Sequence, residues 1–102
     1  MVRSYATCIK VIDGDTFETN TNLRIRLARV YAPELDSATG LVAKNTLAWM
    51  IEGKIISYEI SAFDDYGRAV CEVWLASLPI NDWMRGQGYD KPQWFPPPWM
   101  NP

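Results

Sequence analysis

Hydrophobic and polar positions alternate along the first third of the chain, as they do in β-strands that bury one face. In residues 23–30, Leu23, Ile25 and Leu27 fall on one side of such a strand, and Arg24 and Arg26 fall on the other. Short polar turns separate three segments of this kind. These segments are predicted as strands over residues 5–12, 16–19 and 23–30. Their short connections predict an antiparallel meander.

The apolar spacing becomes helical after Pro33. Apolar residues then recur at i, i+4, i+7 and i+8, in the order Ala43, Leu47, Met50 and Ile51. This spacing predicts a helix over residues 41–52, with Ser37 or Thr39 as its N-cap and Gly53 at the position of a C-terminal cap.

Two further alternating segments, residues 54–60 and 69–75, predict a fourth and a fifth strand separated by a turn. A short second helix is predicted to open at Ser77-Leu78-Pro79 and to stop at Gly88, with Ile80, Trp83 and Met84 as its apolar stripe. Three strands, a helix, two strands and a short helix is the order of an OB-fold, a small five-stranded Greek-key barrel. The predicted fold class is therefore mainly β, with one helix between strands three and four and one after strand five.

The length of 102 residues favours one domain. Residues 1–90 are predicted to form the barrel, and residues 91–102 a tail rich in proline and tryptophan. Five prolines in the tail exclude a regular helix or a central strand. Two interpretations stay open: a strap that covers one face of the barrel, or an exposed segment for self-association or a protein partner.

Composition narrows the possible chemistry. The net charge is −2, so any binding of nucleic acid must depend on a local basic site. The chain has no histidine, which excludes the usual serine and cysteine triads and His-containing zinc sites. Cys8 and Cys71 are interpreted as buried free thiols, with a disulfide as the alternative.

The N-terminal residues lack the apolar core of a signal peptide, and no run reaches the ~20 apolar residues that span a bilayer. We therefore expect a cytoplasmic protein without a membrane partner.

Charged residues stand at strand ends, where they could carry chemistry. Asp13 and Asp15 flank Gly14, and this pair is either an Asx-turn or carboxylates aimed at the barrel mouth. Glu34 follows a stiff Ala-Pro step and could act as a general base, although an exposed loop Glu is the alternative. Arg26 could grip a phosphate, or it could be a surface arginine paired with a carboxylate.

Arg68 follows a turn, Asp64-Asp65-Tyr66-Gly67, at the start of a strand. It could stabilise the charge that develops in phosphoryl transfer, or the segment could be an ordinary hairpin turn.

With these motifs in this order, the chain resembles the staphylococcal nuclease (thermonuclease) family. The likeness runs from about Thr7 to Gly88. The motifs that carry it are Val11-Ile12-Asp13-Gly14-Asp15-Thr16, Arg26-Leu27, Ala32-Pro33-Glu34, Asp64-x-Tyr66-Gly67-Arg68 and Ile80-Asn81. The resemblance implies an OB-type barrel and a calcium-dependent phosphodiesterase that cleaves DNA and RNA.

The resemblance also implies roles for single residues. Asp15 and the backbone carbonyl of Ala32 would be calcium ligands, and Glu34 would activate the attacking water. Arg26 and Arg68 would bind the scissile phosphate, with Arg68 also a candidate acid toward the leaving oxygen.

The chain departs from the family pattern at Tyr31, where the family usually has a second metal-binding aspartate. A phenol is a poor calcium ligand, and the number of carboxylates tunes calcium affinity. The basic C-terminal helix of some family members is also replaced by the Pro/Trp tail.

The principal hypothesis is therefore a calcium-dependent nuclease with activity weakened by the missing aspartate. The alternative is a non-catalytic OB module that binds single-stranded DNA, RNA or a protein, with Tyr31 as a stacking platform. A purely structural or assembly role is the third interpretation.

Overall fold

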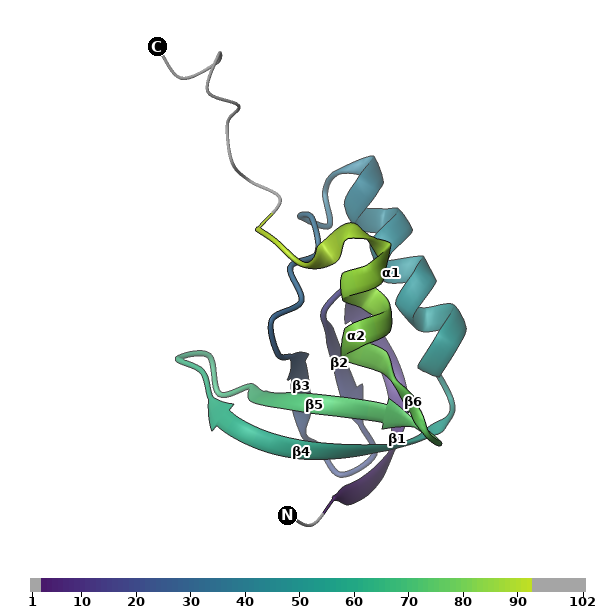
Figure 1. Cartoon of the computed structure of the whole chain (residues 1–102). Coiled ribbons are helices and arrows are strands. Elements are labelled where there is room, and N and C mark those ends of the chain that lie inside the picture. Colours follow the sequence, from purple (N-terminus) through teal and green to yellow (C-terminus); the bar gives the residue numbers. More distant parts are fainter. Residues whose placement is uncertain (1–2, 93–102) are drawn as a thin grey trace.

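The computed structural model describes residues 3–92, which form a closed five-stranded barrel with a helix between the third and fourth strands and a short helix after the fifth (Figure 1). The strands of the barrel are β1 (Ser4–Asp13), β2 (Thr16–Thr19), β3 (Arg24–Leu27), β4 (Ile55–Phe63) and β5 (Ala69–Leu75). The other elements are helix α1 (Ala38–Ile51), the short strand β6 (Leu78–Pro79), helix α2 (Ile80–Met84) and the π-helical turn η1 (Arg85–Tyr89). The mainly β OB-type barrel predicted from the order of elements is confirmed.

A parallel pairing between β3 and β5 closes the barrel. The other neighbours, in the order β3-β2-β1-β4-β5, pair antiparallel. In the closing pair Arg26 lies opposite Val70. Residues two apart in an extended segment share a face. Arg68, two residues before Val70, therefore lies on the same side of the barrel wall as Arg26.

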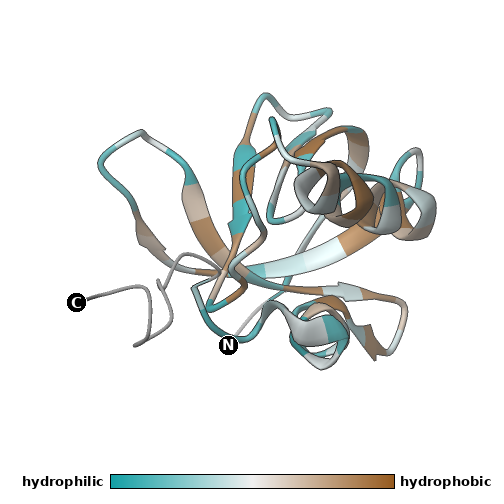
Figure 2. Ribbon diagram, turned by 90° about the horizontal axis from the view of Figure 1, so that it is seen from above, coloured by the Kyte–Doolittle hydropathy of each residue, from teal (hydrophilic) through white to brown (hydrophobic). Residues whose placement is uncertain are grey.

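The predicted alternation fills the barrel interior. Ile25 and Leu27 are fully buried, whereas Arg24 is exposed and Arg26 is half-buried. Hydrophobic and hydrophilic residues alternate along the strands in Figure 2. The four apolar positions predicted for the first helix are also buried: Ala43, Leu47, Met50 and Ile51. The hydrophobic pattern therefore gave the correct buried face of both kinds of element.

The third strand is shorter than predicted. It ends at Leu27 because Arg29 has a left-handed backbone (φ 54°), which the extended chain cannot continue. The carbonyl of Ala28 accepts hydrogen bonds from Asn81 Nδ2 at 3.2 Å and Arg85 Nη1 at 2.9 Å. Two side chains from α2 and η1 thus hold the turn that the periodicity assigned to the strand.

Other observed boundaries also differ from the predicted ones. Helix α1 begins at Ala38 instead of residue 41, because Ser37 is the N-cap and accepts the N–H of Gly40 at 3.0 Å. Strand β4 continues past residue 60 to Phe63, which pairs with Ala69 of β5. The second helix begins only at Ile80, since Leu78 pairs with Leu75 as the short strand β6.

Cys8 and Cys71 are both buried free cysteines, as interpreted from the sequence. Burial raises the pKa of Cys8 to about 11 and that of Cys71 to about 12, so both thiols are protonated at neutral pH. They contribute apolar volume to the core.

Within residues 3–92, no helix is both long and apolar enough to cross a bilayer. Most of the predicted tail, residues 93–102, lies outside the described residues. The proposed strap or partner role of that tail therefore stays a prediction.

Candidate active site

All the site residues predicted from the sequence line one cleft of about 950 Å³. They are Asp15, Arg26, Tyr31, Ala32, Glu34 and Arg68, and Asp13 and Tyr89 join them in its walls. The turn after β1, strand β3, the loop before α1 and the turn before β5 contribute to this cleft. The fold thus brings together groups that are up to about three quarters of the chain apart in sequence.

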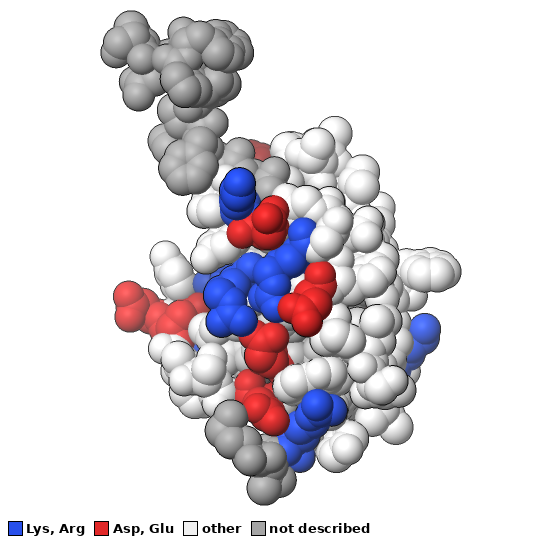
Figure 3. All heavy atoms as spheres, viewed as in Figure 1, with Lys and Arg blue, Asp and Glu red and all other residues white. Residues whose placement is uncertain are grey.

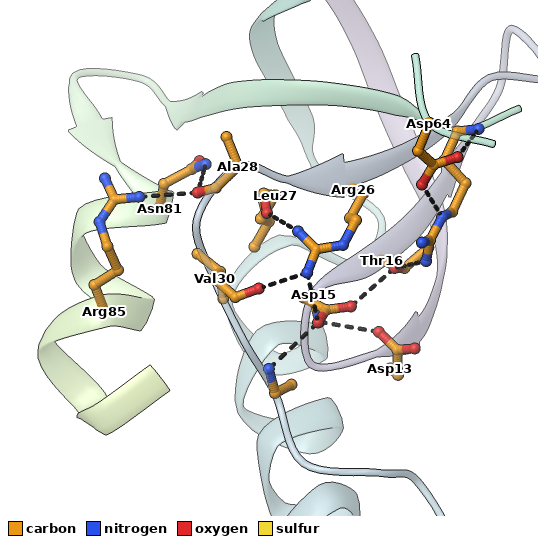
Figure 4. A network of polar contacts seen from close by, with 12 residues as sticks. Asp13, Asp15, Thr16, Arg26, Leu27, Ala28, Val30, Asp64, Asn81 and Arg85 are labelled. Carbon is orange, nitrogen blue, oxygen red and sulfur yellow. Dashed lines mark hydrogen bonds and ion pairs between the residues drawn. The ribbon is translucent and has the colours of Figure 1, made fainter. Parts of the chain in front are cut away.

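Asp15 lies at the centre of the polar network in the cleft (Figure 4). Its Oδ1 accepts a hydrogen bond from Thr16 Oγ1 at 2.9 Å. Its Oδ2 accepts the backbone N–H of Ala32 at 3.3 Å and lies 3.7 Å from Arg26 Nη2. The backbone amide of Ala32 therefore contacts the Asp15 carboxylate, and this hydrogen bond holds the loop before α1 against the turn after β1.

Asp13 stands beside this carboxylate. Its Oδ1 accepts the N–H of Asp15 at 3.0 Å, which is an Asx-turn and agrees with the structural interpretation of that residue. Burial, which is the larger effect, and the neighbouring Asp13 together raise the pKa of Asp15 to about 6. Arg26 and Thr16 act in the opposite direction and lower it. Two close carboxylates therefore favour binding a proton or a cation.

The metal-free protein is expected to lose stability as the pH rises from 3.8 to about 6. The folded-state pKa of Asp15 exceeds the ordinary 3.8, so folding favours the protonated carboxyl. This stabilisation is present below 3.8 and is lost as pH rises through about 6, with a size on the order of 3 kcal/mol. Urea unfolding with EDTA across this window measures it.

Asp15→Asn should flatten this pH dependence, whereas the exposed Asp65→Asn should leave it as in the wild type. Equal slopes in the wild type and Asp15→Asn would contradict the assignment to Asp15.

Backbone carbonyls orient Arg26. Nη1 donates to the carbonyl of Leu27 at 2.7 Å, and Nη2 donates to the carbonyl of Val30 at 3.1 Å. The side chain is mostly buried, at 19 % exposed. The ring of Tyr31 lies beside the guanidinium, 5.7 Å from its central carbon to the ring centroid. The guanidinium therefore has a fixed direction before any ligand arrives.

Asp64 orients Arg68. One Asp64 oxygen accepts the backbone N–H groups of Tyr66 and Arg68, both at 2.9 Å, and the other accepts Arg68 Nε at 2.6 Å. Arg68 Nη1 also donates to Thr16 Oγ1 at 3.3 Å. Desolvation alone would raise the pKa of Asp64, but the bonds and charge of Arg68 and the Tyr66 amide bring it below its ordinary value. The turn formed by residues 64–67 therefore orients the side chain of Arg68.

The loop that carries Glu34 is tied down at its start. The N–H of Tyr31 donates to the carbonyl of Tyr89 at 2.9 Å, which joins the loop to η1. The Glu34 side chain is exposed at the cleft. A solvent-exposed carboxylate in a cleft with two fixed arginines can accept a proton from water beside a bound anion.

Glycine at position 14 is required by space. A Cβ there would lie 2.6 Å from the Cβ atoms of Ala32 and Ala43. An Asp-Gly turn often needs a positive φ at its glycine, but the positive-φ glycines of residues 3–92 are Gly53, Gly67 and Gly88. Gly14 instead lets the turn with Asp15 pack against the loop and α1.

Several arginines of the protein are engaged in ion pairs outside the cleft. On the face drawn in Figure 3, a central group of basic side chains is bordered by acidic side chains, and other basic side chains lie apart from it. Among the ion pairs, Arg29 and Arg85 both join Glu72, and Arg85 also pairs with Asp82. Arg26 and Arg68 also have acidic neighbours, Asp15 and Asp64, but unlike Arg29 and Arg85 they line the cleft, so they are the candidates for anion binding.

Oxygen atoms of Asp13 and Asp15 are the donors that could hold a metal ion. Calcium prefers oxygen ligands, and the crowding of these two carboxylates suits a cation. In residues 3–92 no group of three or more Cys, Asp or Glu side chains is placed to hold a metal ion. Two carboxylates leave most of the six to eight oxygen ligands of calcium to carbonyls, water or a bound phosphate, so calcium binding here stays a prediction.

Sequence reasoning named Asn81 and Thr16 only as members of motifs and gave no role to either, although both support the cleft. Asn81 is fully buried and bonds to the backbone of β5 and of the turn after β3. Thr16 bonds to both Asp15 and Arg68. The sequence signal for Asn81 was a polar residue next to the apolar positions of a short helix. Its hydrogen bonds to β5 and to the turn after β3 explain why this polar residue is buried.

No family model matches the chain. The chain is similar to a protein of Haemophilus influenzae described as an uncharacterized endonuclease, with 33 % identity over 92 residues, which cover 84 % of this chain and 52 % of that protein. It is also similar to protein ParB of Escherichia coli, with 35 % identity over 78 residues, covering 70 % of this chain and 44 % of that protein. The chain thus spans about half the length of these relatives. The distant endonuclease relative and the closed barrel are compatible with a nuclease-like OB fold.

Proposed function

We propose that the chain is a calcium-dependent nuclease that hydrolyses phosphodiester bonds of single-stranded DNA or RNA. The observation that carries this proposal is the pair of fixed guanidinium groups, Arg26 and Arg68, in one cleft with Asp15 and Glu34. The endonuclease name of the Haemophilus relative and the resemblance of the motifs to staphylococcal nuclease support the same reaction class. A barrel used only for binding would have no chemical need for this combination.

The two arginines would bind and polarise the scissile phosphate. Arg26 and Arg68 each spend part of their N–H groups on protein acceptors, and the guanidinium carries five. The remaining N–H groups are available for phosphate oxygens. Because both guanidiniums are oriented in advance, little reorganisation is needed as charge develops on the phosphate.

Glu34 would accept a proton from the attacking water. The water oxygen then bonds to phosphorus, and the bond from phosphorus to the leaving oxygen breaks. Arg68 would donate a hydrogen bond to that leaving oxygen, which takes up a proton from solvent, and Glu34 then releases the proton it accepted to solvent. Calcium bound by Asp15, with Asp13 and the Ala32 carbonyl as further oxygen donors, would supply positive charge for the phosphate and lower the pKa of a bound water.

Tyr31 is the reason to expect weak activity. It lines the cleft where the resemblance leads us to expect a second carboxylate. A phenol adds no negative charge to the cation site. We therefore propose a calcium affinity below that of a site with both carboxylates.

Cleavage of a labelled single-stranded oligonucleotide tests the proposal, with calcium, with EDTA and with Glu34→Gln. Calcium-dependent cleavage by the wild type is expected, and Glu34→Gln should lower kcat about 10²–10⁴-fold. The amide is matched in shape and cannot accept the proton. Cleavage by the wild type that equals the Glu34→Gln background would contradict the proposed function.

A second candidate is a binding module without catalysis, favoured by the Tyr31 ring at the cleft. Its ring could stack on a base, which is worth ~1–3 kcal/mol. The same assay separates the two candidates, because a binding module would retain the oligonucleotide uncut in both calcium and EDTA.

A further inference from the structure

We propose that Gly40 and Ser37, in the first turn of α1 and its cap, are positioning residues that fix Glu34 for proton transfer. This inference rests on the proposed function, because it concerns the base of that reaction. Neither residue contributes a group that reacts. Both contact the backbone of Glu34, on the side where the loop meets the helix.

Gly40 and Glu34 are in direct backbone contact. A Cβ added at Gly40 would lie 1.8 Å from the carbonyl oxygen of Glu34 and 2.5 Å from its carbonyl carbon. It would also lie 2.9 Å from the carbonyl oxygen of Pro33. Any side chain at position 40 therefore displaces the peptide that carries Glu34, since the neighbouring atoms are backbone.

Ser37 holds the same carbonyl from a second direction. Its N–H donates to the Glu34 carbonyl at 3.1 Å, and its hydroxyl donates to that oxygen at 2.6 Å. The same hydroxyl accepts the N–H of Gly40 at 3.0 Å. The N-cap of α1 and the backbone of Glu34 thus form one hydrogen-bonded unit.

The other end of the loop is fixed independently. Ala32 packs against Gly14 and donates its N–H to Asp15 at 3.3 Å. The Glu34 backbone is therefore held between the aspartate turn on one side and the helix cap on the other.

Backbone placement matters because the Glu34 side chain is exposed. An exposed side chain gains little orientation from packing, so the position of its Cα limits where the carboxylate can reach. A general base must come within about 2.6–3.2 Å of the oxygen whose proton it takes. A displacement of about 1 Å at a reacting group can lower a rate about 10²-fold.

The main test is Gly40→Ala with Gly86→Ala as the matched control. A Cβ at Gly86 would meet no heavy atom within 4 Å, so the control adds the same methyl without a contact. Gly40→Ala is expected to lower kcat about 10²-fold while KM for a single-stranded oligonucleotide changes by less than about twofold. The KM stays because Arg26 and Arg68 bind the phosphate and lie on other elements. Gly86→Ala should keep both constants.

Ser37 provides a second test if Gly40→Ala fails to fold, which circular dichroism detects. Ser37→Ala should lower kcat about tenfold, and Ser37→Thr should restore it because threonine keeps the hydroxyl. Thr46→Ala is the matched control, since it removes a hydroxyl that bonds within α1 to the carbonyl of Val42. Its kcat should stay at the wild-type value.

Amide hydrogen exchange of Ser37 in EDTA gives a readout without catalysis. Exchange at this N–H should be faster in folded Gly40→Ala than in the wild type, with no such change in Gly86→Ala. A folded Gly40→Ala or Ser37→Ala with wild-type kcat would overturn the positioning role, and so would a KM that rises as much as kcat falls. A wild type without calcium-dependent cleavage would overturn the proposed function and the positioning role of Gly40 and Ser37 together. Unchanged Ser37 exchange in Gly40→Ala would overturn the positioning role alone.

Discussion

Tyr31→Asp is expected to increase calcium affinity and nuclease activity, each by about tenfold or more. The backbone of Tyr31 is fixed by its bond to the Tyr89 carbonyl, and its side chain lines the cleft that holds Asp15. A carboxylate at this position adds a negatively charged oxygen ligand to a site with few carboxylates. Calorimetric titration with calcium and cleavage of a single-stranded oligonucleotide measure the two effects.

Tyr31→Asn is the matched control for this variant. It removes the ring and has the shape of aspartate, but it adds no charge. Calcium affinity should rise only in Tyr31→Asp. Equal affinities in the two variants would mean that the metal geometry differs from the proposed one. A carboxylate that pairs with Arg26 instead would also produce that result, because the Tyr31 ring already lies 5.7 Å from that guanidinium.

Asn81→Ala is expected to lower the free energy of unfolding by about 3 kcal/mol or more. Asn81 is fully buried, and its amide makes three hydrogen bonds to backbone. Its Oδ1 accepts the N–H of Val73 at 2.9 Å, and its Nδ2 donates to the carbonyls of Cys71 at 2.9 Å and Ala28 at 3.2 Å. The substitution leaves buried backbone groups without their partner, each at a cost of ~1–3 kcal/mol.

Urea unfolding measures this loss, with Asn45→Ala as the control of the same residue type. Asn45 is exposed on α1, so its substitution should change the free energy of unfolding by less than about 0.5 kcal/mol. Similar losses in the two variants would contradict the role of the buried amide. Asn81→Ala should also reduce nuclease activity, because the turn at Ala28 leads to Val30, whose carbonyl orients Arg26.

The geometry of the cleft supports the proposed anion binding by Arg26 and Arg68 more fully than the proposed calcium binding. Arg26 and Arg68 have fixed directions from named partners. Asp15, in contrast, already bonds to Thr16 and Ala32 and lies near Arg26. A bound calcium would compete with that arginine for the same carboxylate, which is why the charge added by Tyr31→Asp should have a large effect.

Local pattern predicted most of the fold. Alternation identified β2 and β5 with their observed bounds and the buried faces of β3 and α1. It did so because the burial of alternating side chains depends on local geometry. Predicted boundaries that depend on distant partners were wrong. Strand β3 ends early because Arg29 has a left-handed backbone, in a turn where Asn81 and Arg85 donate hydrogen bonds to the carbonyl of Ala28. These two side chains come from more than fifty residues later in the chain.

The sequence by itself determined the order of elements, the buried faces and the residue types of the cleft. The tertiary structure decided how those residues meet. The parallel pairing of β3 with β5 puts Arg26 and Arg68 on one face, and no local periodicity encodes which strands close a barrel. Close packing decided the rest: Gly14 is required by the methyl groups of Ala32 and Ala43, which it approaches across the fold, and Gly40 is required by the backbone of Glu34, six residues before it. The path of the loop into α1 sets this second contact, and no periodicity specifies that path, so the sequence could name Glu34 but could not show what holds it.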